Sequence, residues 1–210
     1  MKKGYFITLE GLDGVGKSTH ASWLESRLGT CGYSVLKTRE PGGTDYGERL
    51  RPIFLCLDIS VEAECMLAMS MRLQHVSEKI LPALSSGQYV VCERFMDATY
   101  AYQSGGRGMS YSKIYAIEKV LTLPNVDLTF FLDAPFDVLR QRLDPANVDR
   151  FELQSSDFFA RVRAIYQRRI QEDPCRFVVI DATQPIDIIR EIIDCSLVDK
   201  GIISSSIALD

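Results

Sequence analysis

The sequence predicts an α/β fold: a single domain in which helices flank a five-stranded parallel sheet. Short apolar runs alternate with longer helical patterns along the chain, which is typical of parallel strands joined by helical crossovers. A length of 210 residues suits one domain with one well-buried core. The composition, 46% hydrophobic and 25% charged residues, is that of an ordinary globular protein.

Five strands are expected in short β-rich runs, most of which are continuously apolar, as strands buried on both faces are. These runs span residues 5–9, 34–38, 89–92, 128–132 and 177–180. Helical patterns lie near 17–30, 63–85, 110–122, 155–172 and 185–198. In the second pattern, apolar side chains at spacings of three and four residues form one helix face, namely Met66, Met69, Leu73, Val76 and Ile80. No repeat or linker divides the chain, so we expect one domain over 1–200 and a tail over 201–210.

A glycine-rich loop follows the first predicted strand and opens the first helix. It fits the phosphate-binding pattern G-x-x-x-x-G-K-[ST], the P-loop. Glycines let the backbone approach phosphate oxygens closely, and the helix N-terminus adds N–H groups and positive potential. Lys17 would reach the outer phosphates, and the Ser18 hydroxyl would ligate Mg²⁺. The expected triphosphate-binding residues are Gly11, Leu12, Asp13, Gly14, Val15, Gly16, Lys17, Ser18 and Thr19.

Polar, arginine-rich residues follow the other predicted strands. Because the carboxyl ends of parallel strands meet at one edge, ligands of such sheets bind there. The segments at that edge are 39–44, 93–95, 133 and 181–185. Phosphoryl transfer brings several negative charges together and needs convergent cations. The candidates are Lys17, Arg39, Arg94, Arg140, Arg142 and Arg150, with an exposed helix face as the alternative for Arg140 and Arg142.

Composition excludes several classes of function. A net charge of −4 argues against a broad nucleic-acid surface, and no apolar run is long enough for a membrane helix. The six cysteines are scattered without a C-x-x-C pair, so we expect buried thiols and a cytoplasmic location. Only two histidines are present, so a structural zinc site has no support.

The segment Thr38-Arg39-Glu40-Pro41-Gly42-Gly43-Thr44 resembles the signature loop of thymidylate kinases, which phosphorylate dTMP with ATP. The resemblance continues in the family's order through 63–64, 72–76, 80–84, 101–103, 106–108, 149–152 and 180–184. It spans nearly the whole chain. It implies a P-loop nucleotide kinase fold with a short lid over about 139–150, the substrates ATP and dTMP, the cofactor Mg²⁺ and a homodimer.

The resemblance also implies the acceptor site. Asp13 would contact the 3′-hydroxyl of dTMP, and Arg39 and Arg94 would hold its phosphate. Pro41 and Gly42 would shape the pocket.

The thymine carbonyl would accept a hydrogen bond from Arg72, assisted by Thr99 and Gln103. Tyr102 would pack against the deoxyribose. Packing in the core remains an alternative for Tyr102, as helix capping does for Thr99.

On the donor side, the resemblance places Thr183 and Gln184 near adenine. The chain departs from the family pattern at several positions, among them the lid segment 143–147, where relatives often carry further arginines. Glu93 replaces the usual aspartate of the metal network, and Ala68 stands where relatives place a phenylalanine that stacks on thymine. Val15 is not basic, so a lid arginine, Arg142 or Arg150, would supply the transition-state cation.

Two other functions remain open from the sequence. A deoxynucleoside kinase would place a general-base glutamate at Glu93, but the loop at 39–43 favours a monophosphate acceptor. A nucleotide-binding switch without transfer activity would not need a second set of polar loops, and the chain has no N-K-x-D motif for guanine.

Overall fold

The protein is described by a computed structural model that covers residues 4–142 and 150–204. Residues 143–149, which make up most of the expected lid, and 205–210 of the expected tail lie outside the described residues.

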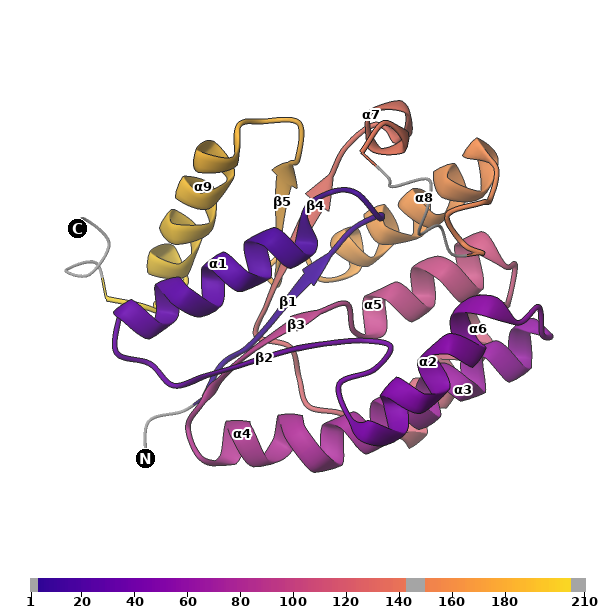
Figure 1. Cartoon of the computed structure of the whole chain (residues 1–210), viewed down its shortest axis with the longest axis horizontal. Coiled ribbons are helices and arrows are strands. Elements are labelled where there is room, and N and C mark those ends of the chain that lie inside the picture. The colour runs from indigo at the N-terminus through magenta and orange to yellow at the C-terminus, as the bar shows by residue number, and fades with distance from the viewer. Residues whose placement is uncertain (1–3, 143–149, 205–210) are drawn as a thin grey trace.

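The five expected strands are present, each within one residue of its expected bounds. They are β1 (Phe6–Glu10), β2 (Val35–Arg39), β3 (Tyr89–Glu93), β4 (Leu128–Asp133) and β5 (Phe177–Asp181). All neighbouring pairs are parallel, and the strand order is β2-β3-β1-β4-β5. The prediction of a parallel five-stranded sheet is therefore confirmed (Figure 1).

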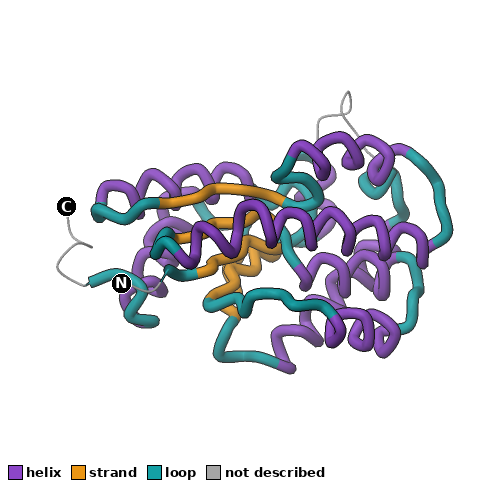
Figure 2. Tube along the Cα trace, turned by 90° about the horizontal axis from the view of Figure 1, so that it is seen from below, coloured by secondary structure: helices purple, strands orange, loops and turns teal. Residues whose placement is uncertain are grey.

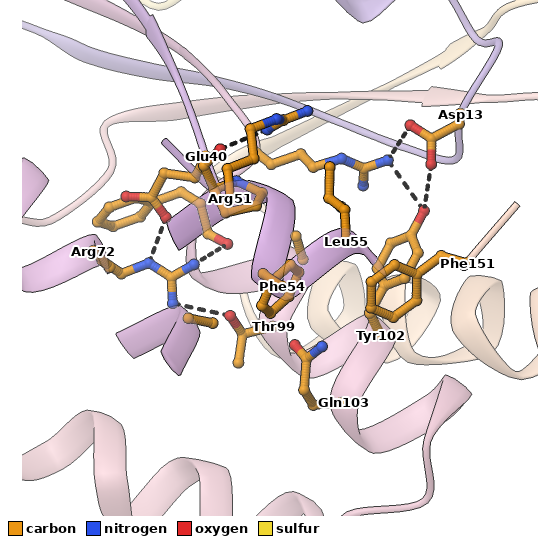
Figure 3. A pocket seen from close by; sticks show the side chains of 15 residues that line it. Asp13, Glu40, Arg51, Phe54, Leu55, Arg72, Thr99, Tyr102, Gln103 and Phe151 are labelled. Atoms are coloured by element: carbon orange, nitrogen blue, oxygen red, sulfur yellow. Dashed lines mark hydrogen bonds and ion pairs between the residues drawn. The ribbon is translucent and has the colours of Figure 1, made fainter. Parts of the chain in front are cut away.

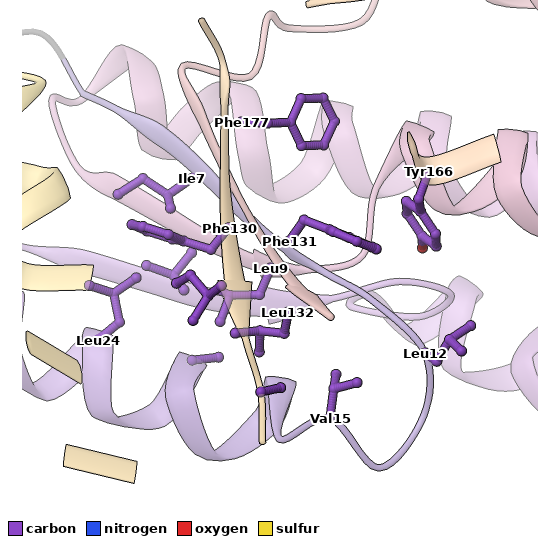
Figure 4. Close-up of a cluster of buried hydrophobic side chains, with 14 of the residues drawn as sticks. Ile7, Leu9, Leu12, Val15, Leu24, Phe130, Phe131, Leu132, Tyr166 and Phe177 are labelled. Atoms are coloured by element: carbon purple, nitrogen blue, oxygen red, sulfur yellow. The ribbon is translucent and has the colours of Figure 1, made fainter. Parts of the chain in front are cut away.

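Successive side chains of the central strands enter two separate hydrophobic clusters, because side chains alternate between the faces of a strand. Ile7 and Leu9 belong to one cluster, where Leu24 of α1 (Lys17–Thr30) also lies (Figure 4). Phe6 belongs to the other, together with Val90. Helices on both faces thus bury the three central strands β1, β3 and β4, whereas the edge strands β2 and β5 stay partly exposed.

The helices form layers on the two faces of the sheet (Figures 1 and 2). Helices α1 and α9 (Ile186–Asp199) contribute to the Ile7 cluster. The second predicted helix is a continuous run of α3 (Val61–His75), a π-helical turn η1 (Val76–Ile80) and α4 (Leu81–Ser85). It packs on the Phe6 side with α6 (Tyr111–Val120). The remaining predicted helix is α8 (Ser156–Glu172).

Three helical segments were not expected from the sequence: α2 (Asp45–Cys56), α5 (Met96–Thr99) and the π-helical η2 (Tyr100–Gly106). A fourth, α7 (Phe136–Arg140), has Arg140 exposed at its last position, which agrees with the helix-face alternative for that arginine. Helix α2 begins at a capping threonine, since the Thr44 side chain accepts a hydrogen bond from the Gly47 N–H. Pro52 lies inside this helix and weakens its sequence signal. The other three are short, so they carry little periodicity.

The apolar face expected on α3 is only half buried. Met69, Val76 and Ile80 are buried, whereas Met66 is 54% exposed and Leu73 is 38% exposed. At the other end of the chain, Ile202 and Ile203 are buried, so the first residues of the expected tail pack against the domain.

Candidate active site

The carboxyl ends of the strands converge as the parallel topology requires. Leu9 pairs with Glu93, and Arg39 also pairs with Glu93, so the segments that follow three strands start side by side. The P-loop leaves β1 at Gly11, whose φ is 138°. A Cβ at Gly11 would lie 2.3 Å from the Leu132 carbonyl oxygen, so only glycine fits there.

Lys17 is buried inside its own loop. Its Nζ donates to the carbonyl oxygens of Gly11 at 3.2 Å and Leu12 at 2.7 Å, and to Asp13 Oδ1 at 3.3 Å. Burial lowers the pKa of Lys17 to about 8, and the Arg94 charge adds to this effect while Asp13 opposes it. The ammonium group is thus positioned at the phosphate-binding loop but is costly to keep charged.

The other P-loop residues divide into buried anchors and exposed polar groups. Leu12 and Val15 are buried in the Ile7 cluster, so their backbone alone is available to a ligand. Gly14 and Gly16 have positive φ values, 82° and 94°. Thr19 is exposed in the first turn of α1.

Ser18 and Glu93 lie together, as the expected metal site requires. The Ser18 hydroxyl donates to Glu93 Oε2 at 2.6 Å. These hard oxygen donors suit Mg²⁺, which in phosphate sites takes one or two protein ligands and fills the rest with phosphate oxygens and water. The described residues contain no cluster of three His, Cys, Asp or Glu side chains that would hold a metal by itself.

Arg94 lies at the centre of the edge in a left-handed backbone conformation, with φ at 63°. Such strain in a residue other than glycine costs on the order of 1–3 kcal/mol and is retained mainly at functional sites. Its Nη2 donates to Asp13 Oδ1 at 2.6 Å and to the Tyr102 hydroxyl at 3.1 Å. Burial would raise the pKa of Asp13, but the charges of Arg94 and Lys17 outweigh it and hold that pKa well below its ordinary value.

Glu10 is a fully buried carboxylate behind Arg94. It accepts the Phe95 N–H at 2.7 Å and the Tyr166 hydroxyl at 2.8 Å. Burial, with the Asp97 charge, raises the pKa of Glu10 to about 7, although Arg94 opposes the shift. Glu10 therefore holds the backbone next to Arg94 in place through its hydrogen bond with the Phe95 N–H.

A pocket opens beside Arg94, between the P-loop, α2, α3 and the α5–η2 segment (Figure 3). It is lined by Asp13, Glu40, Pro41, Arg51, Phe54, Leu55, Ala68, Arg72, Arg94, Phe95, Ala98, Thr99, Tyr102, Gln103 and Phe151. Seven of the residues expected to form the acceptor site line it: Asp13, Pro41, Arg72, Arg94, Thr99, Tyr102 and Gln103. The expected residues thus come together from distant parts of the chain.

Arg72 lies at the end of the pocket away from Asp13 (Figure 3). Its guanidinium is buried and donates to Glu40 Oε2 at 2.6 Å, Thr99 Oγ1 at 2.9 Å and the Phe95 carbonyl oxygen at 3.0 Å. The other Glu40 oxygen lies 3.0 Å from His75 Nδ1. Thr99 therefore orients Arg72 and does not cap a helix N-terminus.

Tyr102 is buried, but its hydroxyl is not confined to the core. The hydroxyl lies between Arg94 and Asp13, 3.4 Å from Asp13 Oδ2. The Arg94 guanidinium lies over the Tyr102 ring, 4.8 Å from its centre. Tyr102 thereby links the pocket wall to the P-loop.

Arg39 does not line this pocket. Its Nη2 donates to Glu48 Oε2 at 3.0 Å, and half of its side chain is exposed. Gly42 has a φ of 137°, and a Cβ there would lie 2.5 Å from Glu48 Oε1. Arg51 of α2 lines the pocket instead and donates to the Pro41 carbonyl oxygen at 2.5 Å.

The two lid arginines lie in different places. Arg142 Nη1 donates to the Ala182 carbonyl oxygen at 3.1 Å, beside the expected adenine loop. In that loop, Asp181 accepts hydrogen bonds from Thr183 and Gln184. Arg150 instead donates to the Phe54 carbonyl oxygen at 2.8 Å and packs on the Phe151 ring.

Sequence reasoning missed three features of the pocket. The first is the charged residue Arg51 of α2. The capping residue Thr44 was the sequence signal for this helix and could have revealed Arg51. Phe54 and Phe151 line the same pocket as Ala68 and supply its aromatic wall, with ring centres 5.7 Å apart. Phe54 stands in no motif, and Phe151 belongs to the family segment 149–152 without a role that the sequence assigns, so only the tertiary structure shows their position in the pocket.

Known proteins resemble this chain over most of its length. The family model for thymidylate kinase matches residues 9–193. The chain belongs to the thymidylate kinase family. It is 44% identical to the thymidylate kinase of Bordetella pertussis over 195 residues, which cover 91% of this chain and 93% of the relative. It is 46% identical to that of Burkholderia thailandensis over 197 residues, covering 91% and 96%.

A solved structure agrees with the fold. The crystal structure of thymidylate kinase from Ehrlichia chaffeensis superposes with a TM-score of 0.73 at 30% identity, covering 88% of this chain and 90% of that chain. The family expectation from the loop at 38–44 is therefore confirmed. In the described part of the chain, every helix is too short or too polar to span a bilayer.

Proposed function

We propose that this member of the thymidylate kinase family phosphorylates dTMP to dTDP by direct, in-line transfer of the γ-phosphoryl group of ATP. The observation that carries this proposal is the position of Arg94. It contacts Asp13 of the P-loop and Tyr102 of the adjoining pocket, so one guanidinium lies between a donor site and an acceptor site. The acceptor oxygen of dTMP is already anionic at neutral pH, so no general base is needed.

On the donor side, the backbone of residues 11–19 would bind the ATP phosphates. Lys17 would exchange its hydrogen bonds to the loop carbonyl oxygens for hydrogen bonds to phosphate oxygens. Ser18 and Glu93 would hold Mg²⁺, which when bound neutralises charge on the transferring phosphoryl group. Thr183 and Gln184 would lie near adenine. Arg142, which contacts the same loop, is the lid arginine better placed for the donor.

On the acceptor side, Arg94 would bind the dTMP phosphate. Arg51 is a second phosphate ligand that the geometry supports, because it lines the same pocket. Arg39 would reach that phosphate only after releasing Glu48. Asp13 would accept from the 3′-hydroxyl, while Arg72, Thr99 and Gln103 would bind the thymine.

The arrangement of Glu93 favours a monophosphate acceptor over a nucleoside. A deoxynucleoside kinase needs a carboxylate that faces the acceptor as a general base. Glu93 accepts from Ser18 and is absent from the residues that line the acceptor pocket. Thymidine should therefore be a far poorer acceptor than dTMP.

Steady-state rates at fixed MgATP test the proposal. We expect the wild-type protein to convert dTMP to dTDP and to leave thymidine nearly untouched. Arg94→Ala should raise the KM for dTMP and lower kcat together, by on the order of a hundredfold or more in kcat/KM. The control is Arg168→Ala, which removes an exposed arginine of α8 that pairs with Glu172. Full activity of Arg94→Ala would refute the assignment.

A homodimer is the second part of the proposal, and an exposed apolar surface supports it. Tyr46, Met66 and Leu73 are 44%, 54% and 38% exposed, and they line a shallow groove with Met69 and Ile117. A contiguous apolar surface of this kind is typical of protein interfaces. A second copy of the chain is the occupant that the family resemblance implies.

The cytoplasmic location stays a prediction.

A further inference from the structure

Glu64 is a buried carboxylate that lies beside the acceptor pocket without lining it. It stands in the first turn of α3, and its exposed fraction is 0%. Its Oε1 accepts from Gln103 Nε2 at 2.8 Å, and its Oε2 accepts from Arg150 Nη2 at 2.6 Å. Arg107 Nε lies 3.4 Å from the same oxygen. A buried charge with partners on every side is held in one orientation.

The carboxylate determines which end of the Gln103 amide faces the pocket. An ionised carboxylate can only accept hydrogen bonds, whereas an amide has a donor end and an acceptor end. The NH₂ end of Gln103 must therefore point to Glu64. The opposite end, Oε1, accepts no hydrogen bond within the described part of the chain, and Gln103 lines the pocket.

This orientation selects among pyrimidines by their hydrogen-bonding edges. Arg72 and Gln103 both line the pocket, one offering N–H donors and the other an amide oxygen. Thymine and uracil present a carbonyl acceptor at position 4 and an N–H donor at position 3, which match that pair. Cytosine presents an amino donor at position 4 and an acceptor at position 3, so both contacts are mismatched. A site rejects strongly a base that would leave its buried polar groups unpaired.

We propose that Glu64 is a positioning residue for pyrimidine selectivity: it fixes the Gln103 amide so that the site accepts a base with an N3–H and rejects cytosine. This inference rests on the proposed role of Arg72 and Gln103 at the base.

The test is the ratio of kcat/KM for dTMP to that for dCMP in the wild type and in Glu64→Gln. An amide at position 64 can donate or accept, so Gln103 becomes able to reverse. We expect the dTMP to dCMP ratio to fall by about tenfold or more, since one mismatched buried contact is relieved. The dTMP to dUMP ratio should not change, because both bases share the same edge. A merely structural loosening would alter both ratios.

Two controls bracket the effect. Glu62→Gln removes an exposed carboxylate of the same helical turn, whose nearest cation is Lys113 at 3.6 Å, and should keep wild-type selectivity. Arg107→Gln removes another partner of Glu64 and should keep the selectivity as well. In a Gln103→Leu background, Glu64→Gln should cause no further change in the ratio.

Several results would overturn the proposal. An unchanged dTMP to dCMP ratio in a folded Glu64→Gln protein is one, and an equal fall in Arg107→Gln is another. If Glu64→Gln does not fold, Glu64→Asp keeps the charge but withdraws the carboxylate from Gln103, and the same fall in the ratio is expected. A wild-type protein that fails to phosphorylate dTMP would instead refute the proposed function.

Discussion

Lys17 combines a required charge with an unfavourable environment. Its ammonium group is buried among loop carbonyls and lies near Arg94, which is why its pKa falls to about 8. Phosphate binding needs the charged form. With Lys17 in its proposed role at the ATP phosphates, the free protein should lose part of its affinity for ATP when the pH rises through this value.

The first prediction concerns this titration. We expect kcat/KM for ATP to decline above about pH 8, because kcat/KM reports the ionisation of the free enzyme. Rates measured from pH 6.5 to 9.5 at saturating dTMP check it. In Lys17→Ala the rate should fall by hundreds-fold, and the decline near pH 8 should vanish. An unchanged pH profile in that variant would assign the titration to another group.

Glu10 gives a second prediction at the residue scale. Its pKa is raised from 4.5 in an exposed chain to about 7, so the folded protein holds a proton that the unfolded chain has lost. That contribution to stability is complete below pH 4.5 and is lost as the pH rises through 7. Glu10→Gln lacks the titrating group. Denaturant unfolding at pH 5 and pH 8 should show the variant gaining about 1–3 kcal/mol relative to the wild type at the higher pH. A constant difference would contradict the burial argument.

Among the elements, η2 and α8 make an unusually close contact, and glycines allow it. A Cβ at Gly105 would lie 2.5 Å from the Arg161 carbonyl oxygen, and one at Gly106 would lie 2.4 Å from the Phe158 ring. Because η2 carries Tyr102 and Gln103, this contact positions one wall of the acceptor pocket.

The third prediction tests that contact. Gly106→Ala should reduce the free energy of unfolding by about 1–3 kcal/mol, as overpacking of a dense interface does. It should also raise the KM for dTMP more than the KM for ATP, since only the acceptor wall moves. Gly29→Ala is the matched control: a Cβ in α1 meets nothing there, and replacing a helical glycine should stabilise by about 0.5 kcal/mol. Chemical denaturation and the two KM values decide the outcome.

The regular elements were predictable because buried parallel strands read as continuous apolar runs. The strand from Leu128 is an example, with its first five residues buried. Helix α2 was missed because Pro52 weakens its sequence signal, although the helix runs through it, and because its N-terminal signal at Thr44 overlaps the family loop. The π-helical turns η1 and η2 have no periodicity that distinguishes them from α-helix.

For the whole molecule, the sheet topology predicts which edge carries the candidate site, and the P-loop and the pocket do lie together at that edge. The partners of individual side chains were not predictable. Arg39 ends a strand at the carboxyl edge of the sheet, as predicted, yet its side chain pairs with Glu48. Arg51 lines the pocket instead, from a helix that the sequence did not reveal. The sequence placed Glu64 in a family motif but could not predict its partner, because Gln103 lies 39 residues away.

The fourth prediction concerns assembly. Leu73→Glu places a charge in the exposed apolar groove and should convert a dimer to monomers in sedimentation velocity. Ile188→Glu changes a comparably exposed residue of α9, 43% exposed, outside that groove, and should leave the mass unchanged. A wild-type protein that sediments as a monomer at all concentrations would refute the dimer.

The central claim is that one edge of the sheet holds ATP and dTMP together, with Arg94 between them. Calorimetric titration with a bisubstrate that joins adenosine and thymidine through a phosphate chain tests it most directly. The account predicts one molecule bound per chain, about a hundredfold or more tighter than ATP or dTMP alone, with most of the gain lost in Arg94→Ala. A bisubstrate that binds no more tightly than ATP would contradict it.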